Sequence, residues 1–135
     1  MPSLAPPDIG AVWADAHRES VKLAVPEKAS YLLETIGPRL AAAALGLSDA
    51  RQIKRWSTSG DDIEPREQLV AQRLDALYWI VRSINTVYSA AVAARFIRSS
   101  NPQLEDAAPL VALAESSEPS EITRVVAATR AFLEG

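Results

Sequence analysis

The chain of 135 residues contains no cysteine, one histidine and one methionine, and only five of its residues are glycine. The absence of cysteine excludes a disulfide scaffold, a cysteine nucleophile and any thiolate metal site. The one histidine, His17, has no second histidine and no cysteine with which to build a zinc site. Scarce glycine, together with an apolar set dominated by alanine, favours helical structure.

Sequence motifs for catalysis are also missing. We find no glycine-rich phosphate loop and no nucleophile elbow. Asp61, Asp62 and Glu64 cluster in a short acidic stretch, but they lack the spacing of a calcium-binding EF-hand, so a solvated turn is the better interpretation. We read His17 as a surface residue and expect no enzyme activity, no metal and no cofactor.

No long apolar run is present, because arginines interrupt the hydrophobic stretches, and we expect no contact with a membrane. The first residues, MPSLAPPDIG, have neither the basic nor the apolar region of a signal peptide. The lack of cysteine fits a reducing compartment. These features together predict a cytoplasmic protein.

The charge of the chain is acidic overall but unevenly spread. The net charge is −3, whereas residues 37–58 carry four cations and one anion, which is a net charge of +3. The cations of this window are Arg39, Arg51, Lys54 and Arg55, and the anion is Asp49. An acidic protein with one short basic window points to a localised binding surface.

Prolines and glycines divide the chain into helices, with no strand-like alternation, so we predict an all-α fold. The pattern predicts a helix from Asp8, which can cap it, to about Ala24, and a second helix that starts at Pro26. A short alanine-rich helix follows Gly37-Pro38, and after a turn at residues 46–48 another helix runs over about 49–58. A short helix is expected from Pro109, and a last helix over SEITRVVAATRAFLEG after Pro119.

Between these short elements, residues 65–99 contain no glycine or proline after Pro65, which predicts one long central helix. Its stretch LYWIVRSINTVYSAAVAARFI is apolar almost all the way round, so we expect it to be buried on more than one side. A second subunit is a plausible cover in so small a protein. The expected organisation is a helical N-terminal extension (1–29), a helix-turn-helix domain with the long central helix (30–95) and a small C-terminal helical domain (96–135).

The basic helix at 49–58 has two distinct faces. At 100° per residue, Ile53 and Trp56 lie on one side, and the opposite side carries Arg51, Lys54, Arg55 and Thr58. This is the division expected of a helix-turn-helix recognition helix, whose outer face enters the major groove of DNA. The four outward residues are therefore candidate DNA-binding residues, and the alternative interpretation of this face is a solvated surface.

Two stretches, in this order, resemble antitoxins of the Xre/MbcA/ParS type. The first is GPRLAAAALGLSDARQIKRWSTSG followed by REQLVAQRLDALYWIVRSI, and the second is ARFIRSSNPQLEDAAPLVALAE followed by a final helix. The basic pair before Trp56 resembles the recognition helix of that family, and Phe96 stands where its toxin-binding domain often has tryptophan. The resemblance covers about residues 30–135.

Further C-terminal motifs carry the same resemblance. Asn101, Pro102 and Leu104 resemble the family's asparagine-proline-x-leucine turn, and Pro109, Leu110 and Leu113 resemble the proline-leucine-x-x-leucine that follows it. The chain departs from the pattern at residues 105–108, where EDAA replaces the usual glycines and a serine or lysine.

The resemblance implies a type II toxin–antitoxin pair. It implies a cognate toxin as partner, often one that consumes NAD through a RES domain, together with operator DNA, a homodimer and repression of the antitoxin's own promoter. It places the end of the chain, about Thr129 to Gly135, near the toxin's active site. The implied toxin-binding residues are Phe96, Asn101, Pro102, Leu104, Pro109, Leu110, Leu113 and Phe132.

Two other hypotheses remain open from the sequence. The same fold can serve as a protein-interaction module, or as a stand-alone regulator with no toxin, and the net charge of −3 favours the module that has lost DNA binding. Replacement of Arg51 and Arg55 by alanine discriminates a regulator, which loses operator binding, from a pure neutraliser. An enzyme would need most of its chemistry from a partner.

Overall fold

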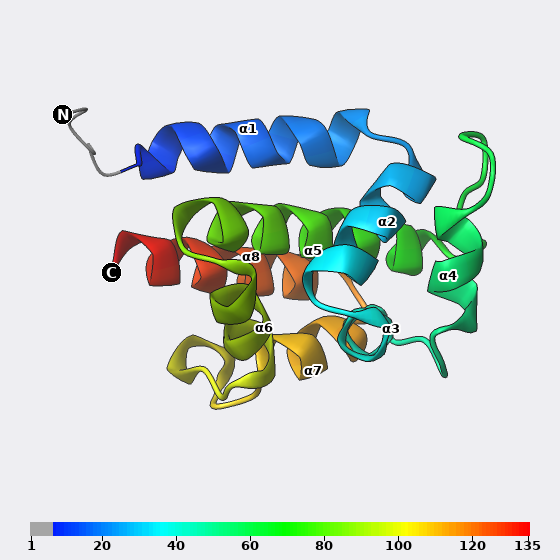
Figure 1. Ribbon diagram of the computed structural model, residues 1–135. Coiled ribbons are helices and arrows are strands. Elements are labelled where there is room, and N and C mark those ends of the chain that lie inside the picture. The colour runs from blue at the N-terminus through cyan, green and yellow to red at the C-terminus, as the bar shows by residue number, and fades with distance from the viewer. Residues whose placement is uncertain (1–6) are drawn as a thin grey trace, which may run out of the picture.

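The computed structural model describes residues 7–135, so residues 1–6 of the expected N-terminal extension lie outside the described range. Over residues 7–135 the chain forms eight α-helices and one 3-10 helix with no strand, which confirms the all-α fold class. The elements in chain order (Figure 1) are α1 (Ile9–Lys22), α2 (Val25–Thr35), α3 (Pro38–Leu45), α4 (Arg51–Ser57), α5 (Gln68–Val87), α6 (Ala90–Arg98), η1 (Pro102–Leu104), α7 (Pro109–Ala114) and α8 (Pro119–Glu134). In this described part, no helix combines the length and the hydrophobicity needed to cross a bilayer.

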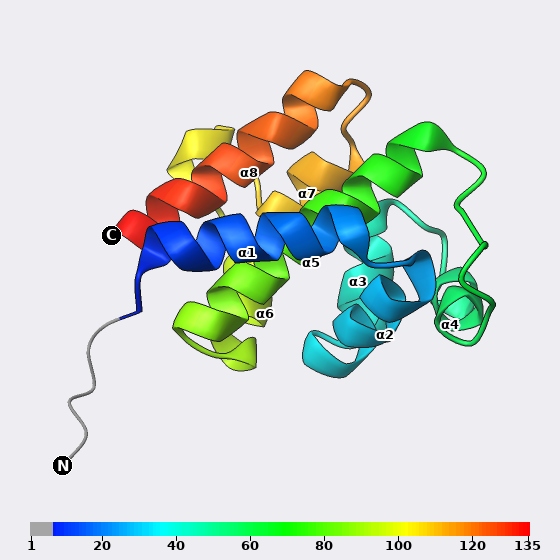
Figure 2. The ribbon, with the colours of Figure 1, turned by 90° about the horizontal axis from the view of Figure 1, so that it is seen from above.

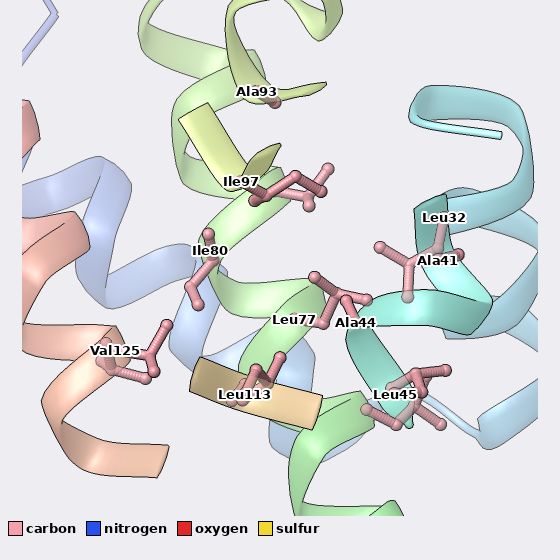
Figure 3. Close-up of a cluster of buried hydrophobic side chains, with 14 of the residues drawn as sticks. Leu32, Ala41, Ala44, Leu45, Leu77, Ile80, Ala93, Ile97, Leu113 and Val125 are labelled. Atoms are coloured by element: carbon pink, nitrogen blue, oxygen red, sulfur yellow. The ribbon is translucent and has the colours of Figure 1, made fainter. Parts of the chain in front are cut away.

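Helix α5 is the centre of the fold, and α1, α2, α3, α6 and α8 all pack against it. Figure 2 shows α1 lying along α5 with α8 beside them. Leu77 and Ile80 of α5 are almost fully buried, and Figure 3 shows them among side chains contributed by α2, α3, α6, α7 and α8. One hydrophobic core thus joins all parts of the described chain.

The expected single helix over 65–99 is wrong. The chain forms two helices there, because the backbone leaves helical geometry at Tyr88 (φ −121°, ψ −90°) and restarts after Ser89. The Ser89 hydroxyl accepts a hydrogen bond from the Val92 N–H at 3.1 Å, which caps the new helix. The break lets α6 fold back on α5 and bury Phe96 and Ile97, which a straight helix would leave without this cover.

The apolar sides of α5 do not require a second subunit to cover them. The sequence pattern of α5 is apolar on most sides, as expected, but helices of the same chain cover those sides. The start of the helix differs too, since α5 begins at Gln68 with Glu67 as its N-cap and not at Pro65. The expected boundaries after residues 29 and 95 fall inside α2 and α6.

Helix α1 is fastened to α5 by aromatic and polar contacts. Asp8 caps α1 as expected, with its carboxylate accepting from the Ala11 N–H at 3.2 Å. The rings of Trp13 and Trp79 lie 4.5 Å apart, and the Trp79 indole donates to the Trp13 carbonyl at 3.0 Å. Near the other end of α1, the Tyr78 hydroxyl donates to Glu19 at 2.9 Å.

Stability at high pH is expected to depend on Tyr78. Burial, and after it the hydrogen bond to Glu19, raises the pKa of the Tyr78 phenol well above its usual value of about 10. The folded chain therefore holds this proton after the unfolded chain has released it, and the stabilisation is lost as pH rises from about 10 upward. The free energy of unfolding, measured in urea between pH 8 and pH 11, should therefore decline less steeply with pH in Tyr78→Phe than in the native chain. The difference in slope should correspond to at most one proton. The exposed Tyr88→Phe is the matched control, and an equally steep decline in both variants would contradict the assignment.

Candidate functional site

Helix α4 presents a basic outer face on a buried apolar one. Ile53 is 0% exposed and Trp56 is 3% exposed, and they pack α4 into the hydrophobic core, mainly through contacts with α2. The side chains on the other face are exposed, as the helical angles predict: Arg51, Lys54, Arg55 and Thr58. Both views place α4 at one edge of the molecule, where a partner can reach it (Figures 1 and 2).

The turn between α3 and α4 depends on one glycine. Gly46 has a left-handed backbone (φ 76°), and its N–H donates back to the carbonyls of Ala42 and Ala43 to end α3. A Cβ at this position would lie 2.8 Å from Nη1 of Arg73 and 3.1 Å from the Ala114 carbonyl oxygen. The helices α3 and α4 cross, since Figure 1 views α3 close to its axis and α4 from the side. These features are typical of a helix-turn-helix.

Gly46→Ala is expected to destabilise the chain. The left-handed backbone costs a residue with a Cβ about 1–2 kcal/mol, and the close approach to Arg73 adds to that cost. The matched control is Gly10→Ala on the exposed face of α1, which should stabilise by up to about 1 kcal/mol because helical alanine is favoured over glycine. Chemical denaturation of both variants checks the pair, and equal shifts of the same sign would contradict the role of Gly46.

The four outward residues of α4 are not equivalent. Asp49 accepts hydrogen bonds from the Arg51 backbone N–H at 2.8 Å and from its guanidinium at 2.8 Å. The hydrogen bonds from the Arg51 side chain and backbone hold the pKa of Asp49 below its usual range. The Thr58 hydroxyl donates to the Arg55 carbonyl at 3.2 Å. Lys54 and Arg55, by contrast, form no ion pair with any other residue of 7–135, so their charges are available to a ligand.

The candidate residues near the C-terminus divide by burial. Leu104, Pro109 and Leu113 are buried and pack η1 and α7 into the fold, so they can shape a binding surface but cannot form it. Asn101 caps η1, with its side-chain oxygen accepting from the Gln103 N–H at 2.9 Å. The more accessible members of this set are the exposed Pro102, the half-buried Leu110 and Phe132, which is 37% exposed.

The loop after η1 holds two residues in left-handed backbone, Glu105 (φ 56°) and Asp106 (φ 66°). Both belong to the segment where the sequence departs from the glycines of the resembling family. The loop is closed by hydrogen bonds from the Asp106 N–H to the Asn101 carbonyl at 2.9 Å and from the Asn101 N–H to the Ala107 carbonyl at 3.1 Å. Left-handed backbone is unfavourable for both residues because each has a Cβ, whereas glycine adopts it without this cost.

The predicted toxin-binding residues Phe96 and Phe132 meet at the far end of α8, in an aromatic cluster with Tyr88, which the sequence did not indicate. The Phe132 ring lies 4.7 Å from Phe96 and 5.7 Å from Tyr88, and Tyr88 is 52% exposed. Tyr88 escaped notice because it was assigned to the interior of one long helix, whereas it lies at the break between α5 and α6. Exposed aromatic side chains that meet from separate elements are typical of protein-binding surfaces.

None of the protein-family models, curated proteins or solved structures compared with the chain matches it.

Helix α1 does not cover α4. Among the described residues, α1 packs along α5, and its Trp13 lies beneath the Arg130 guanidinium of α8, at 5.7 Å. His17 is exposed with its ring 4.4 Å from that of Trp79. Residues 7–135 contain no group of three or more His, Cys, Asp or Glu side chains placed to hold a metal ion.

Proposed function

We propose that the protein is the antitoxin of a type II toxin–antitoxin pair, which binds operator DNA through α3 and α4 and binds a toxin through its C-terminal part. The observation that carries the proposal is the arrangement of α4: its buried Ile53 and Trp56 hold Lys54 and Arg55 outward, and neither cation forms an ion pair within residues 7–135. An outward basic helix after a glycine turn is the arrangement that reads a major groove. Arginine can hold guanine with two hydrogen bonds, and lysine can bind a phosphate.

The proposal includes the finer arrangement expected from the sequence. Within the described residues, the proposed N-terminal extension is α1, the helix-turn-helix domain comprises α2 to α5 and the toxin-binding-like domain comprises α6 to α8, so the boundaries expected after residues 29 and 95 move to the ends of α1 and α5. In this proposal the protein catalyses no reaction of its own, acts in the cytoplasm and binds its operator as a homodimer. The family resemblance further suggests a NAD-consuming toxin with a RES domain.

The positions of the two surfaces support a protein with two partners. Helix α4 lies at one end of the molecule and the C-terminal end of α8 lies at the other in both views (Figures 1 and 2). The cluster formed by Tyr88, Phe96 and Phe132 is at that second end. A toxin on this cluster would leave the outer face of α4 open to DNA.

Co-purification with the product of the neighbouring gene tests the proposal. A tagged chain expressed with that gene should bring down a stoichiometric partner that stops growth when it is expressed alone. The untagged partner passed over the same resin is the control for non-specific retention. A chain that purifies alone, with a neighbouring gene that is harmless, would rule out the toxin partner.

Loss of the aromatic cluster should weaken the partner complex. Tyr88→Ala combined with Phe132→Ala removes two exposed rings, and a central aromatic anchor contributes about 2 kcal/mol or more, so affinity should fall about 30-fold or more by calorimetry. The control is Val21→Ala, which trims an exposed hydrophobic side chain on α1, outside the C-terminal part. If this control weakened the complex as much as the aromatic pair, the partner surface would lie elsewhere.

A protein-interaction module without DNA binding is the second candidate, and it is favoured by one contact. The Asp49–Arg51 ion pair offsets a charge on the groove-facing side of α4, in a chain whose net charge is already −3. Neutralisation of a toxin by the Arg51→Ala/Arg55→Ala double variant, with no DNA binding by either form, would select this function.

A further inference from the structure

A polar hollow of about 580 Å³ lies beside α4, between the turn after α3 and the start of α5. Three of its lining residues are arginines, Arg55 from α4, Arg66 from the preceding loop and Arg73 from α5. Ser48 and Gln52 add neutral donors, and Glu67 is the one acidic residue in the lining. The charges of the lining therefore sum to +2, so the hollow favours an anion.

Within the described part of the chain, none of these three arginines forms an ion pair with an acidic residue. The ion pairs among residues 7–135 involve Arg18, Lys28, Arg51, Arg82, Arg124 and Arg130 only. Arg55 and Arg66 are exposed, and Arg73 is half-buried. A partly buried cation is costly when no anion compensates it, and that cost falls when an anion binds.

Arg73 is held rigidly at the hollow by neutral oxygens. Its guanidinium donates to the Leu45 carbonyl at 3.2 Å, to the Ser116 hydroxyl at 3.1 Å and to the Ser116 carbonyl. These three bonds fix the plane of the group and leave its positive charge uncompensated. Gly46 also lines the hollow, and the absence of a Cβ there lets Arg73 approach the turn.

The start of α5 adds to the same field. Glu67, its N-cap residue, makes no side-chain hydrogen bond to the first N–H groups of this helix of 20 residues. Because Glu67 and Val70 also line the hollow, the positive end of the helix dipole lies beside it.

We propose that this hollow binds a phosphate group, which, if the proposed function holds, is a backbone phosphate of the DNA that α4 reads. Arg55 belongs to both surfaces, because it lies on the outer face of α4 and lines the hollow. A phosphate held here would fix the position of α4 on the duplex without reading sequence. Arg66 and Arg73 thereby become positioning residues that the recognition-helix pattern does not include.

Inorganic phosphate is the first probe, because it tests the site independently of DNA binding. At constant ionic strength, phosphate should shift the amide resonances of Gly46, Ser48 and Val70 saturably in the native chain, and Arg66→Gln should abolish that saturation. The control is Arg98→Gln, which removes an exposed arginine on α6 that also lacks an ion pair among the described residues. Linear, unsaturated shifts in the native chain, or equal binding by Arg66→Gln, would overturn the site.

A short mixed-sequence duplex is the second probe and identifies the source of the phosphate. Between about 50 mM and 200 mM salt, Arg66→Gln should reduce the slope of log K against log salt by about 0.9, the value for one lost phosphate contact. Unchanged slopes with intact phosphate binding would assign the site to a free phosphorylated ligand and overturn the DNA source. If the native chain binds phosphate but no duplex, the proposed regulator function fails while the phosphate site stands.

Discussion

Replacement of Lys54 and Arg55 together by alanine is expected to lower DNA affinity about 100-fold and to leave thermal unfolding unchanged. Both side chains are exposed and free of ion pairs within residues 7–135, so their removal costs the folded chain little. In a complex they would contact bases and phosphates, and one good base contact alone is worth about 1–3 kcal/mol. Fluorescence anisotropy with the chain's own promoter region measures the change.

The matched control removes two cations from another helix. Arg95→Ala with Arg98→Ala on α6 alters the net charge equally, and both side chains are exposed. This pair should weaken binding only severalfold, through the general electrostatic field. If the α4 pair and the α6 pair reduced affinity equally, binding would depend on net charge and not on the face of α4.

Trp56→Ala is expected to destabilise the chain by about 3–5 kcal/mol, the usual cost of truncating a buried aromatic residue. Trp56 is 3% exposed and joins α4 to the core of a protein whose total stability is of the order of 5–15 kcal/mol. The loss should appear as a lower midpoint in urea unfolding, and α3 and α4 should lose their amide protection first. In the proposed function DNA binding should fall with it, although Trp56 lies on the buried face of α4.

The control for Trp56 is its neighbour on the other face of the helix. Thr58→Ala removes an exposed hydroxyl, and surface changes of this kind usually stay within about 0.5 kcal/mol. A loss below about 1 kcal/mol for Trp56→Ala would mean that α4 is not anchored by its buried face. The division of α4 into a core side and a ligand side would then be untenable.

The parts of the fold that depend on local chemistry could be predicted from the sequence. Asp8 predicted the start of α1, Gly46 the end of α3, and the spacing of Ile53 and Trp56 the orientation of α4. Each of these features is set within a few residues by a cap, a left-handed glycine or the helical repeat. Tertiary packing reinforces these preferences and does not oppose them.

The break between α5 and α6 could not be predicted in this way. No glycine or proline marks it, and Ser89 acts as a cap only because α6 gains a buried face against α5. The choice between one helix and two is therefore made by long-range burial, which a local pattern does not contain. The same break brings Tyr88 to Phe132, which lies far from it in the sequence.

The sequence predicted which residues share the exposed face of α4, but it did not predict which of their charges are paired. Helical angles identify Arg51, Lys54 and Arg55 as neighbours, but only the structure shows that Asp49 engages Arg51. Arg73 is 22 positions from Arg51 in the sequence and meets the turn only because α5 packs against α3. Such contacts between separate elements are set by the tertiary fold.

The most direct test of the central claim is a titration of the isotope-labelled chain with a duplex from its own promoter, followed by amide chemical shifts. The account predicts that the largest shifts fall on Arg51–Ser57 of α4 and on the turn at residues 46–48, and that the end of α8 around Phe132 is unaffected. Shifts confined to α6, α7 and α8, or no saturable shift at all, would contradict the assignment of α4 as the helix that binds DNA.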